Sequence, residues 1–471
     1  LSATEQYYTA RGTLSTTSGT PGQGGLRNYT TNDISWNSML RATATKLYRS
    51  LLSTTSVAYQ LENDTFNNFN AGGYILNVNG VPDLAALAQT SLSVGSTLNV
   101  ERTTDYMVSQ SFNLKDRYIV DGLYRRDGSS LFGPNARWSN FYRIAGAYRI
   151  TQDFHIPGFQ ELKVHVAQGT AGLRPTYDMQ YETYTIGNGQ FSKNTVGNKN
   201  LAAAVLTETE YGINCDVLNR VSGELTYANR VTDGAFLQVP LSLAASGGFN
   251  SQWQNAANIL SKTLEGALQT RLVDKRSFTW DLSLTADHTT QEITSMDHAP
   301  FTVSAGGQGQ GVFWYQAGQP LGVIYGTKWV HTFAQLLDNP ANAGAQASDY
   351  VVNPLGYLVL ASQRGTANEV PIPYVDKTGA NKFIIGNVNP NLNYGFQNDV
   401  RWGQFAIHAN FDGQMGGDIY NFSKQWMTQD LRNPGMDMVG KAQDQKVADN
   451  FFTLGIYNGL DPDQYYVESG A

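Results

Sequence analysis

Acidic residues, histidines and thiols are the groups in this 471-residue chain that could do chemistry, yet few have a catalytic or metal-binding spacing. The six histidines, at positions 155, 165, 288, 298, 331 and 408, form no HExxH or similar metal motif. Cys215 is the only cysteine, which excludes an internal disulfide and a paired-thiol zinc site, and we interpret it as a small apolar residue. Asp461 and Asp463 form a carboxylate pair in GLDPDQYY, but a chain with 39 acidic residues contains such pairs by chance. We predict no enzyme activity, no metal site and no cofactor.

The charged residues follow a different pattern, because they alternate with apolar residues along extended stretches. In NFYRIAGAYRIT, Arg143 and Arg149 lie on one face of a predicted strand, and Tyr142 and Ile144 lie on the other. The stretches ELKVHVAQG, TEYGINCDV, VSGELTYAN, FTWDLSLTAD and FAIHANF alternate in the same way. A charged face of this kind lines a water-filled lumen in a transmembrane barrel, where it contacts polar solutes or forms structural ion pairs. The charged residues predicted to face a lumen are Asp121, Arg125, Arg143, Arg149, Lys163, Glu210, Glu224 and Glu265.

Twelve alternating stretches must position these side chains, and their connections are strongly asymmetric. We predict strands near residues 34–45, 50–61, 103–113, 117–126, 139–151, 161–170, 207–217, 220–231, 259–271, 278–289, 391–401 and 404–415. Tight turns alternate with long connections such as 175–207, 232–258 and 291–390, and residues 63–100 are predicted to form another loop with one short helix. Short turns at one end and long loops at the other are typical of outer-membrane barrels. The predicted fold class is therefore all-β, a transmembrane antiparallel β-barrel with long extracellular loops; a soluble all-β protein is the alternative.

Composition narrows the function classes. Charged residues make up only 15% of the chain, and the net charge of −7 argues against binding to a nucleic-acid backbone. No apolar run approaches the roughly 18 residues that a transmembrane helix needs. We predict this organisation: a leading extracellular segment at 1–33, barrel hairpins with long loops at 34–289, a long extracellular loop region at 290–390, a hairpin at 391–421 and an extracellular loop at 422–471.

Several stretches resemble one known family in collinear order. DRYIVDGLYRRDGSSLFGPNARWSNFYRIAGAYRITQDF, followed by LKVHVAQGTAG, resembles the most recognisable barrel stretch of the SusC/RagA-like TonB-dependent outer-membrane transporters. Those proteins carry a similar RRDGSS-x-FG turn and a following W-x-x-F strand. GQPLGVIYGTKWV resembles the family's G-x-P-(L/I)-G-x-x-Y-G segment, and IIGNVNPNLNYGFQNDVRW resembles its IGNPNP-x-x-x-YG-F hairpin.

The chain also departs from the family pattern. Family members have an N-terminal signal, a segment that TonB grips, and a plug inside a 22-stranded barrel. We expect this chain to be a middle-to-late barrel fragment, with about 12 strands, that lacks the plug and the final strands. VLTETE stands where the family has a tryptophan in its L-x-W-E motif, and VPIPYVDKTGANKF replaces an acidic loop, so a calcium site is not implied.

The resemblance implies active import of oligomeric nutrients, either oligosaccharides or peptides, across the outer membrane of a Gram-negative bacterium. The implied partners are TonB, a SusD-like surface lipoprotein, the substrate and the lipid bilayer, with no nucleic acid. Loop aromatics are candidates for stacking on substrate, although they could equally pack loop against loop. They are Trp253, Trp314, Tyr315, Tyr325 and Trp329. Two other functions stay open: a plugless adhesin or receptor, and a secreted all-β glycan-acting enzyme, which needs a convergent carboxylate pair.

Overall fold

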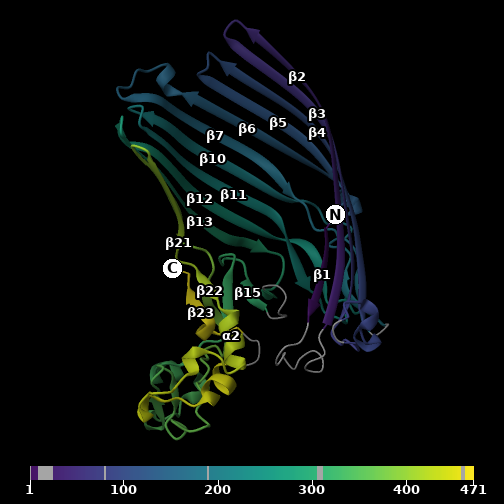
Figure 1. Cartoon of the computed structure of the whole chain (residues 1–471), viewed down its shortest axis with the longest axis vertical. Coiled ribbons are helices and arrows are strands. Elements are labelled where there is room, and N and C mark those ends of the chain that lie inside the picture. The colour runs from purple at the N-terminus through teal and green to yellow at the C-terminus, as the bar shows by residue number, and fades with distance from the viewer. Residues whose placement is uncertain are drawn as a thin grey trace. The chain divides into compact units, whose positions relative to one another are not determined.

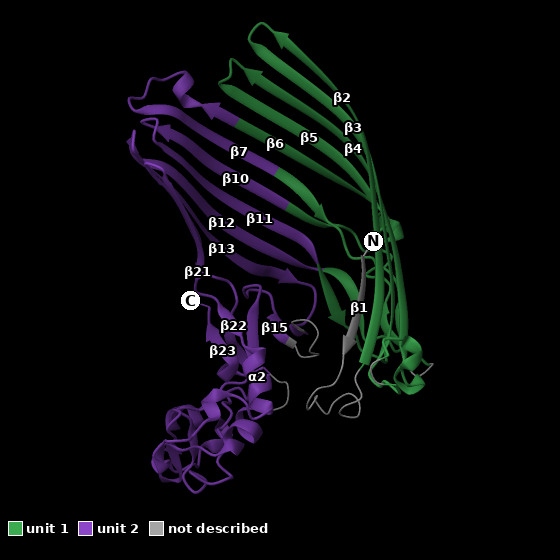
Figure 2. Cartoon of the chain, in the orientation of Figure 1, with its two compact units in different colours: residues 1–146, 169–206, 236–255 green, residues 147–168, 207–235, 256–471 purple. Residues whose placement is uncertain are grey.

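The computed structural model describes residues 2–8, 25–78, 81–187, 190–304, 311–457 and 462–470, so Asp461 lies outside the described residues. The chain forms two compact units, which Figure 2 shows in green and purple. Unit 1 comprises residues 1–146, 169–206 and 236–255, and unit 2 comprises residues 147–168, 207–235 and 256–471. Antiparallel strands dominate both units (Figure 1).

In unit 1 the long strands pair in the order of the chain. The ladder runs β1-β2-β3-β4-β5-β6, and each strand pairs antiparallel with the next from β1 to β5. A short hairpin, β8–β9, adds to it, with β9 running parallel to the first residues of β12. The bounds are β1 (Ser2–Tyr8), β2 (Gly25–Tyr48), β3 (Leu51–Gly73), β4 (Ser93–Leu114), β5 (Tyr118–Ser129), β6 (Trp138–Arg149), β8 (Thr183–Gly187) and β9 (Gln190–Val196).

In unit 2 the long strands follow the order β7-β10-β11-β12-β13-β20-β21. They are β7 (Phe159–Leu173), β10 (Ala204–Val217), β11 (Val221–Pro240), β12 (Ser251–Lys275), β13 (Phe278–Met296), β20 (Leu392–Trp402) and β21 (Phe405–Met415). The pairs β12–β13, β13–β20 and β20–β21 are antiparallel. The pairing of β13 with β20 brings together strands that about a hundred residues separate.

The long connection between β13 and β20 is not structureless. It contains a small antiparallel sheet in the order β14-β15-β16-β19 and a hairpin, β17–β18, while β22 pairs with β23 after β21. These strands are β14 (Phe301–Ser304), β15 (Gly311–Tyr315), β16 (Val323–Gly326), β17 (Tyr350–Val352), β18 (Leu358–Leu360), β19 (Phe383–Asn387), β22 (Asp418–Tyr420) and β23 (Val467–Ser469).

The helices are short. They are α1 (Phe333–Leu336), α2 (Phe422–Gln429), a π-helix at Phe451–Ile456, and 3-10 turns at Leu84–Ala86, Gln89–Ser91, Pro134–Ala136, Ile150–Gln152, Pro340–Asn342, Ala347–Asp349, Pro434–Met436, Gln443–Gln445 and Gln464–Tyr466. Within the described residues, no helix is long and apolar enough to cross a membrane. A core of Trp329, Val359, Phe451, Phe452, Ile456 and Tyr466 holds the segments around α2 together.

Each of the twelve predicted stretches contains a strand, and the predicted tight turns join them. Lys115 and Asp116 adopt positive φ angles of 55° and 56°, and Leu218 and Asn219 adopt 54° and 55°, as two-residue hairpin turns require. The structure differs from the prediction in strand length. β3 runs to Gly73 and β4 begins at Ser93, so much of the loop predicted at 63–100 is strand. Likewise, β2 begins at Gly25, inside the segment predicted as a leading loop at 1–33.

The apolar face of the sheet is exposed rather than packed. Tyr106, Val108 and Phe112 of β4 are 50%, 49% and 42% exposed, and Phe405 and Ile407 of β21 are 74% and 64% exposed. In water, uncovered apolar surface costs about 25 cal/mol for each Å² that burial would have removed from solvent. Lipid removes that cost, and the alternation therefore belongs to a sheet of the transmembrane barrel class, not to a soluble sandwich.

Candidate functional site

The polar face of unit 1 carries a buried cluster of acidic and arginine residues. Asp105 of β4 and Asp127 of β5 lie directly opposite each other in the strand register, and they are 0% and 4% exposed. Two like charges in that position repel each other. Arg125 compensates for the repulsion, because its Nη2 lies 3.0 Å from Asp105 Oδ1 and 3.4 Å from Asp127 Oδ2.

Arg174, which follows β7 in the chain, extends this cluster. Its Nη2 donates to Asp127 Oδ2 at 3.3 Å, and its Nη1 donates to Glu62 Oε2 at 3.3 Å. Glu62 also accepts a hydrogen bond from Gln60 at 2.7 Å. The cluster therefore joins β3, β4 and β5 to the segment after β7, and its three carboxylates outnumber its two guanidinium groups. We call these five residues, Glu62, Asp105, Arg125, Asp127 and Arg174, the acidic cluster.

Two oxygens of the acidic cluster have capacity to spare. Asp105 Oδ2 and Asp127 Oδ1 are buried and have no hydrogen-bond partner among the described residues. A buried carboxylate oxygen without a donor is costly, by about 1–3 kcal/mol or more for a charged group. The cluster can therefore accept a donor from a water molecule or from a cationic or hydroxylic solute.

Unit 2 carries a second group of charges on its polar face. Arg149 and Glu161 form a two-pronged ion pair, with Nε to Oε1 at 2.8 Å and Nη2 to Oε2 at 2.9 Å. His165 Nε2 lies 3.1 Å from Glu210 Oε1. Such paired contacts fix the side chains and leave the polar face structured rather than mobile.

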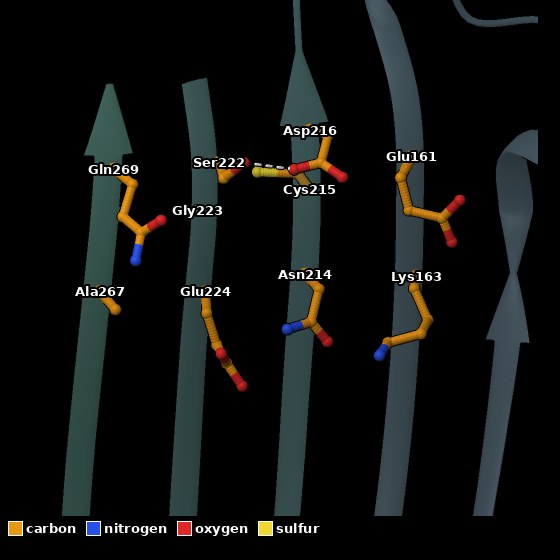
Figure 3. A pocket seen from close by; sticks show the side chains of 10 residues that line it. All are labelled: Glu161, Lys163, Asn214, Cys215, Asp216, Ser222, Gly223, Glu224, Ala267 and Gln269. Carbon is orange, nitrogen blue, oxygen red and sulfur yellow. Dashed lines mark hydrogen bonds between the residues drawn. The ribbon is translucent and has the colours of Figure 1, made fainter. Parts of the chain in front are cut away.

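Next to these pairs the polar face is hollowed, as Figure 3 shows. The hollow has a volume of ≈ 340 Å³ and is lined by side chains of β7, β10, β11 and β12. Its polar lining consists of Glu161, Lys163, Asn214, Asp216, Ser222, Glu224 and Gln269. Lys163 is the single cation in this lining against three carboxylates. An opening of this composition suits solutes rich in hydroxyl groups or carrying positive charge.

Several predicted lumen-facing residues therefore lie within paired or hollowed regions. Arg125 belongs to the acidic cluster, Arg149 pairs with Glu161, and Glu210 pairs with His165. The remaining ones are placed as follows: Lys163 and Glu224 line the hollow of Figure 3, Glu265 lines an adjacent hollow with Asp287, Asp121 lies opposite Ser111 in the register, and Arg143 is exposed on β6. Whether these residues contact a solute stays a prediction.

Sequence reasoning did not select Glu62, Asp105, Asp127 or Arg174. Asp105 and Asp127 carried a signal that was available, because both sit at polar positions of alternating stretches, TTDYMVSQ and GLYRRDGS. Arg174 carried none, since it lies in an irregular segment whose partners are 47 and 112 residues away. Only the paired strands bring these groups together.

The aromatic candidates divide into three situations. Trp314 and Tyr325 stack on each other, with ring centroids 4.3 Å apart and an interplanar angle of 14°. Tyr315 packs beside Phe301 at 6.0 Å between centroids. Trp253, which belongs to unit 1, is half-buried, and its carbonyl oxygen accepts a hydrogen bond from Asn198.

Trp329 differs from the other four, because it is 5% exposed inside the core around α2. Its indole Nε1 donates to Asp463 Oδ1 at 2.8 Å. The ring is therefore committed to packing, and we remove Trp329 from the substrate-stacking set. Burial raises the pKa of the Asp463 carboxyl to about 7, although the hydrogen bonds from Trp329 and the Tyr465 N–H oppose that shift. Among the described residues, no group of three or more His, Cys, Asp or Glu could hold a metal ion.

Comparisons with known proteins agree on one family. The chain is 25% identical over 326 residues to TonB-dependent receptor P26 of Formosa agariphila, a match that covers 66% of this chain and 31% of the relative. It is 26% identical over 239 residues to the TonB-dependent receptor SusC of Bacteroides thetaiotaomicron, covering 46% of this chain and 23% of that protein. The chain belongs to the SusC/RagA-like group of TonB-dependent transporters.

The solved structures agree at the level of the fold. The RagAB peptide transporter superposes with a TM-score of 0.72 and 16% identity, over 96% of this chain and 49% of that one. The RagAB peptide importer in its 'open-open' state gives the same TM-score over 99% of this chain. This chain therefore spans about half the length of the solved neighbours and less of the curated ones. No family model matches it. The relatives are receptors and transporters rather than enzymes, which confirms the expectation of no enzyme activity for this SusC/RagA-like chain.

Proposed function

We propose that this chain is barrel wall and loop structure of an active importer in the outer membrane of a Gram-negative bacterium. The observation that carries the proposal is the two-faced sheet: one face is exposed and apolar, and the other carries buried or paired charges. That division matches a lipid-facing wall around a wet passage. The similarity to SusC and to RagAB supports energisation by TonB and a SusD-like lipoprotein partner.

The proposed cargo is an oligomeric nutrient, either an oligosaccharide or a peptide. The polar face supports this class, because the hollow in Figure 3 offers carboxylates, amides and one ammonium group for hydroxyl and amide groups to contact. Trp253, Trp314, Tyr315 and Tyr325 remain the proposed stacking residues, with the exposed edges of the Trp314–Tyr325 pair as the leading candidate. Aromatic faces are rigid and pay little entropy on binding.

The test follows uptake in cells. Fluorescent oligosaccharides and peptides are supplied to cells that express the full-length gene, to cells that lack it, and to cells that express it without TonB. The proposal expects accumulation of at least one probe that depends on both the gene and TonB. Surface binding without TonB-dependent accumulation would instead establish an adhesin or receptor. Co-purification of a surface lipoprotein with the barrel tests the proposed partner separately.

A further inference from the structure

The apolar face of unit 1 carries two arginines at one level of the membrane wall. Arg126 of β5 lies opposite Tyr106 of β4 in the strand register, and Arg102 of β4 lies opposite Asn63 of β3. Both arginines are exposed. Arg102 Nε donates to Asn63 Oδ1 at 3.1 Å, which holds its guanidinium on the same face as the rings of the next paragraph.

Three aromatic rings surround the arginines. Tyr59 and Tyr106 have ring centroids 5.1 Å apart, and Tyr106 and Trp138 have centroids 6.1 Å apart. Arg126 Cζ lies 5.0 Å from the centre of the Trp138 ring, a cation–π contact. The rings are 36%, 50% and 46% exposed in the order Tyr59, Tyr106, Trp138, so they form a row open to the surroundings.

No carboxylate of the neighbouring strands neutralises these arginines. Side chains alternate between the two faces, and the strand register places every Asp and Glu of β2 to β5 on the polar face. These acids are Asp33, Glu62, Asp64, Glu101, Asp105, Asp121 and Asp127. The arginines of the apolar face therefore lack an anionic partner within β2 to β5.

The height of this row along the strands identifies what surrounds it. Tyr106 lies eight residues, and Arg102 twelve residues, before Leu114 at the tight-turn end of β4. With ~3.3 Å per residue and a strand tilt of ~40°, these positions lie roughly 20 Å and 30 Å from that end. The lipid-facing band of such a barrel is ≈ 25 Å tall. The arginines thus lie at the edge of the band opposite the tight turns, which is the outer-leaflet edge in the orientation that the proposed outer-membrane location implies.

We propose that Arg102 and Arg126 bind the phosphorylated headgroup of an outer-leaflet lipid, flanked by Tyr59, Tyr106 and Trp138. Guanidinium groups match phosphate oxygens with paired hydrogen bonds, and an arginine facing hydrocarbon alone is costly, about 2–4 kcal/mol at the midplane. A phosphate at the interface supplies the missing negative charge. The proposal rests on the outer-membrane location proposed above, but it does not depend on import.

The test uses the purified full-length protein in detergent and lipid A as the probe. Bound lipid is counted by native mass spectrometry during titration with lipid A that carries both phosphates, and with the same lipid after enzymatic dephosphorylation. Loss of one charged hydrogen-bonding group weakens binding by about tenfold. Arg102→Gln and Arg126→Gln are therefore each expected to lower the affinity for phosphorylated lipid about tenfold, and Arg126→Lys less. Arg276→Gln, a matched charge removal in the tight turn between β12 and β13, should leave the affinity unchanged.

Three outcomes would overturn the proposal. They are equal binding of phosphorylated and dephosphorylated lipid, unchanged affinity in the Arg102→Gln/Arg126→Gln double variant, and an equal loss in Arg276→Gln. Competition by inorganic phosphate at the lipid's own concentration would also overturn it, since the site would then select free anions. Heat-modifiable migration on a gel verifies that each variant is a folded barrel. TonB-dependent uptake is measured in parallel, so failed lipid binding with intact uptake separates this inference from the proposed function.

Discussion

Asp105 and Asp127 face each other across β4 and β5 with almost no exposure, and Arg125 lies within ion-pair distance of both. Paired strands force the two carboxylates together, because residues opposite each other in the register share one face. The arrangement is stable only while the guanidinium groups remain. Stability and the shape of the polar face are therefore linked at this point of the wall.

Replacing Arg125 is expected to destabilise the barrel strongly. Arg125→Gln leaves Asp105, which is 0% exposed, without its ion-pair partner, and breaking a buried pair costs about 3–5 kcal/mol. The urea midpoint of unfolding in detergent should fall accordingly. Asp105→Asn in the same chain should restore much of the loss by removing the stranded charge. Equal midpoints for Arg125→Gln and the exposed-turn variant Arg276→Gln would contradict this account.

Asp463 is expected to make the segment around residues 462–466 more stable in mild acid. Burial raises the pKa of this carboxyl to about 7, above its usual 3.8, so the folded state holds a proton that the unfolded state has lost. Stability is then greatest below about pH 4, falls as the pH rises towards 7, and stays low above it, over a range of up to about 4 kcal/mol. Hydrogen exchange of this segment, corrected for the intrinsic rate, should slow from pH 8 to pH 5.5.

The matched variant for that experiment is Asp463→Asn. Its amide oxygen can still accept from Trp329 Nε1, but it does not titrate in this range. Exchange in the variant should therefore show little dependence on pH after correction. A pH response of undiminished size in Asp463→Asn would assign the effect to another group.

Gly326 is expected to tolerate no side chain. A Cβ there would lie 2.3 Å from the carbonyl oxygen of Pro462, which also accepts the Thr327 N–H at 3.0 Å. Because the obstacle is backbone, Gly326→Ala must push the 462–466 segment away, and limited proteolysis should cleave it faster. Gly344→Ala is the control, since nothing lies within 4 Å of its Cβ position. Equal cleavage in both variants would contradict the steric argument.

Trp314 is expected to matter for the cargo and Trp329 for folding. Trp314→Ala removes one ring of a stacked pair, and the loss of a tryptophan contact weakens ligand affinity by about tenfold or more. Isothermal titration with the transported oligomer measures this. Trp329→Ala instead opens a cavity in the core, which should lower the unfolding midpoint by about 3–5 kcal/mol in free energy. Unchanged affinity in a folded Trp314→Ala variant would remove this residue from the proposed site.

Local sequence pattern was sufficient for the strands and turns of this chain. Alternation repeats every two residues, so a short stretch such as ELKVHVAQG already shows which residues share a face. The tight turns were equally local, since Lys115–Asp116 and Leu218–Asn219 form two-residue connections. The same alternation separates the charged face from the apolar one. None of these features requires knowledge of a partner strand.

Strand ends and side-chain partners depended on the tertiary structure. The polar run NDTFNNFN has little β-propensity, yet β3 continues through it because β2 and β4 both offer hydrogen bonds along its length.

The sequence by itself determined where this chain crosses from one face to the other, and with it the fold class. Only the tertiary structure decided that Asp105 meets Asp127, that Arg174 reaches Glu62, and that Trp329 is buried against Asp463. The physical reason is that alternation is a property of neighbouring residues. Register and burial are instead set by segments tens to hundreds of residues away, whose pairing no local pattern encodes.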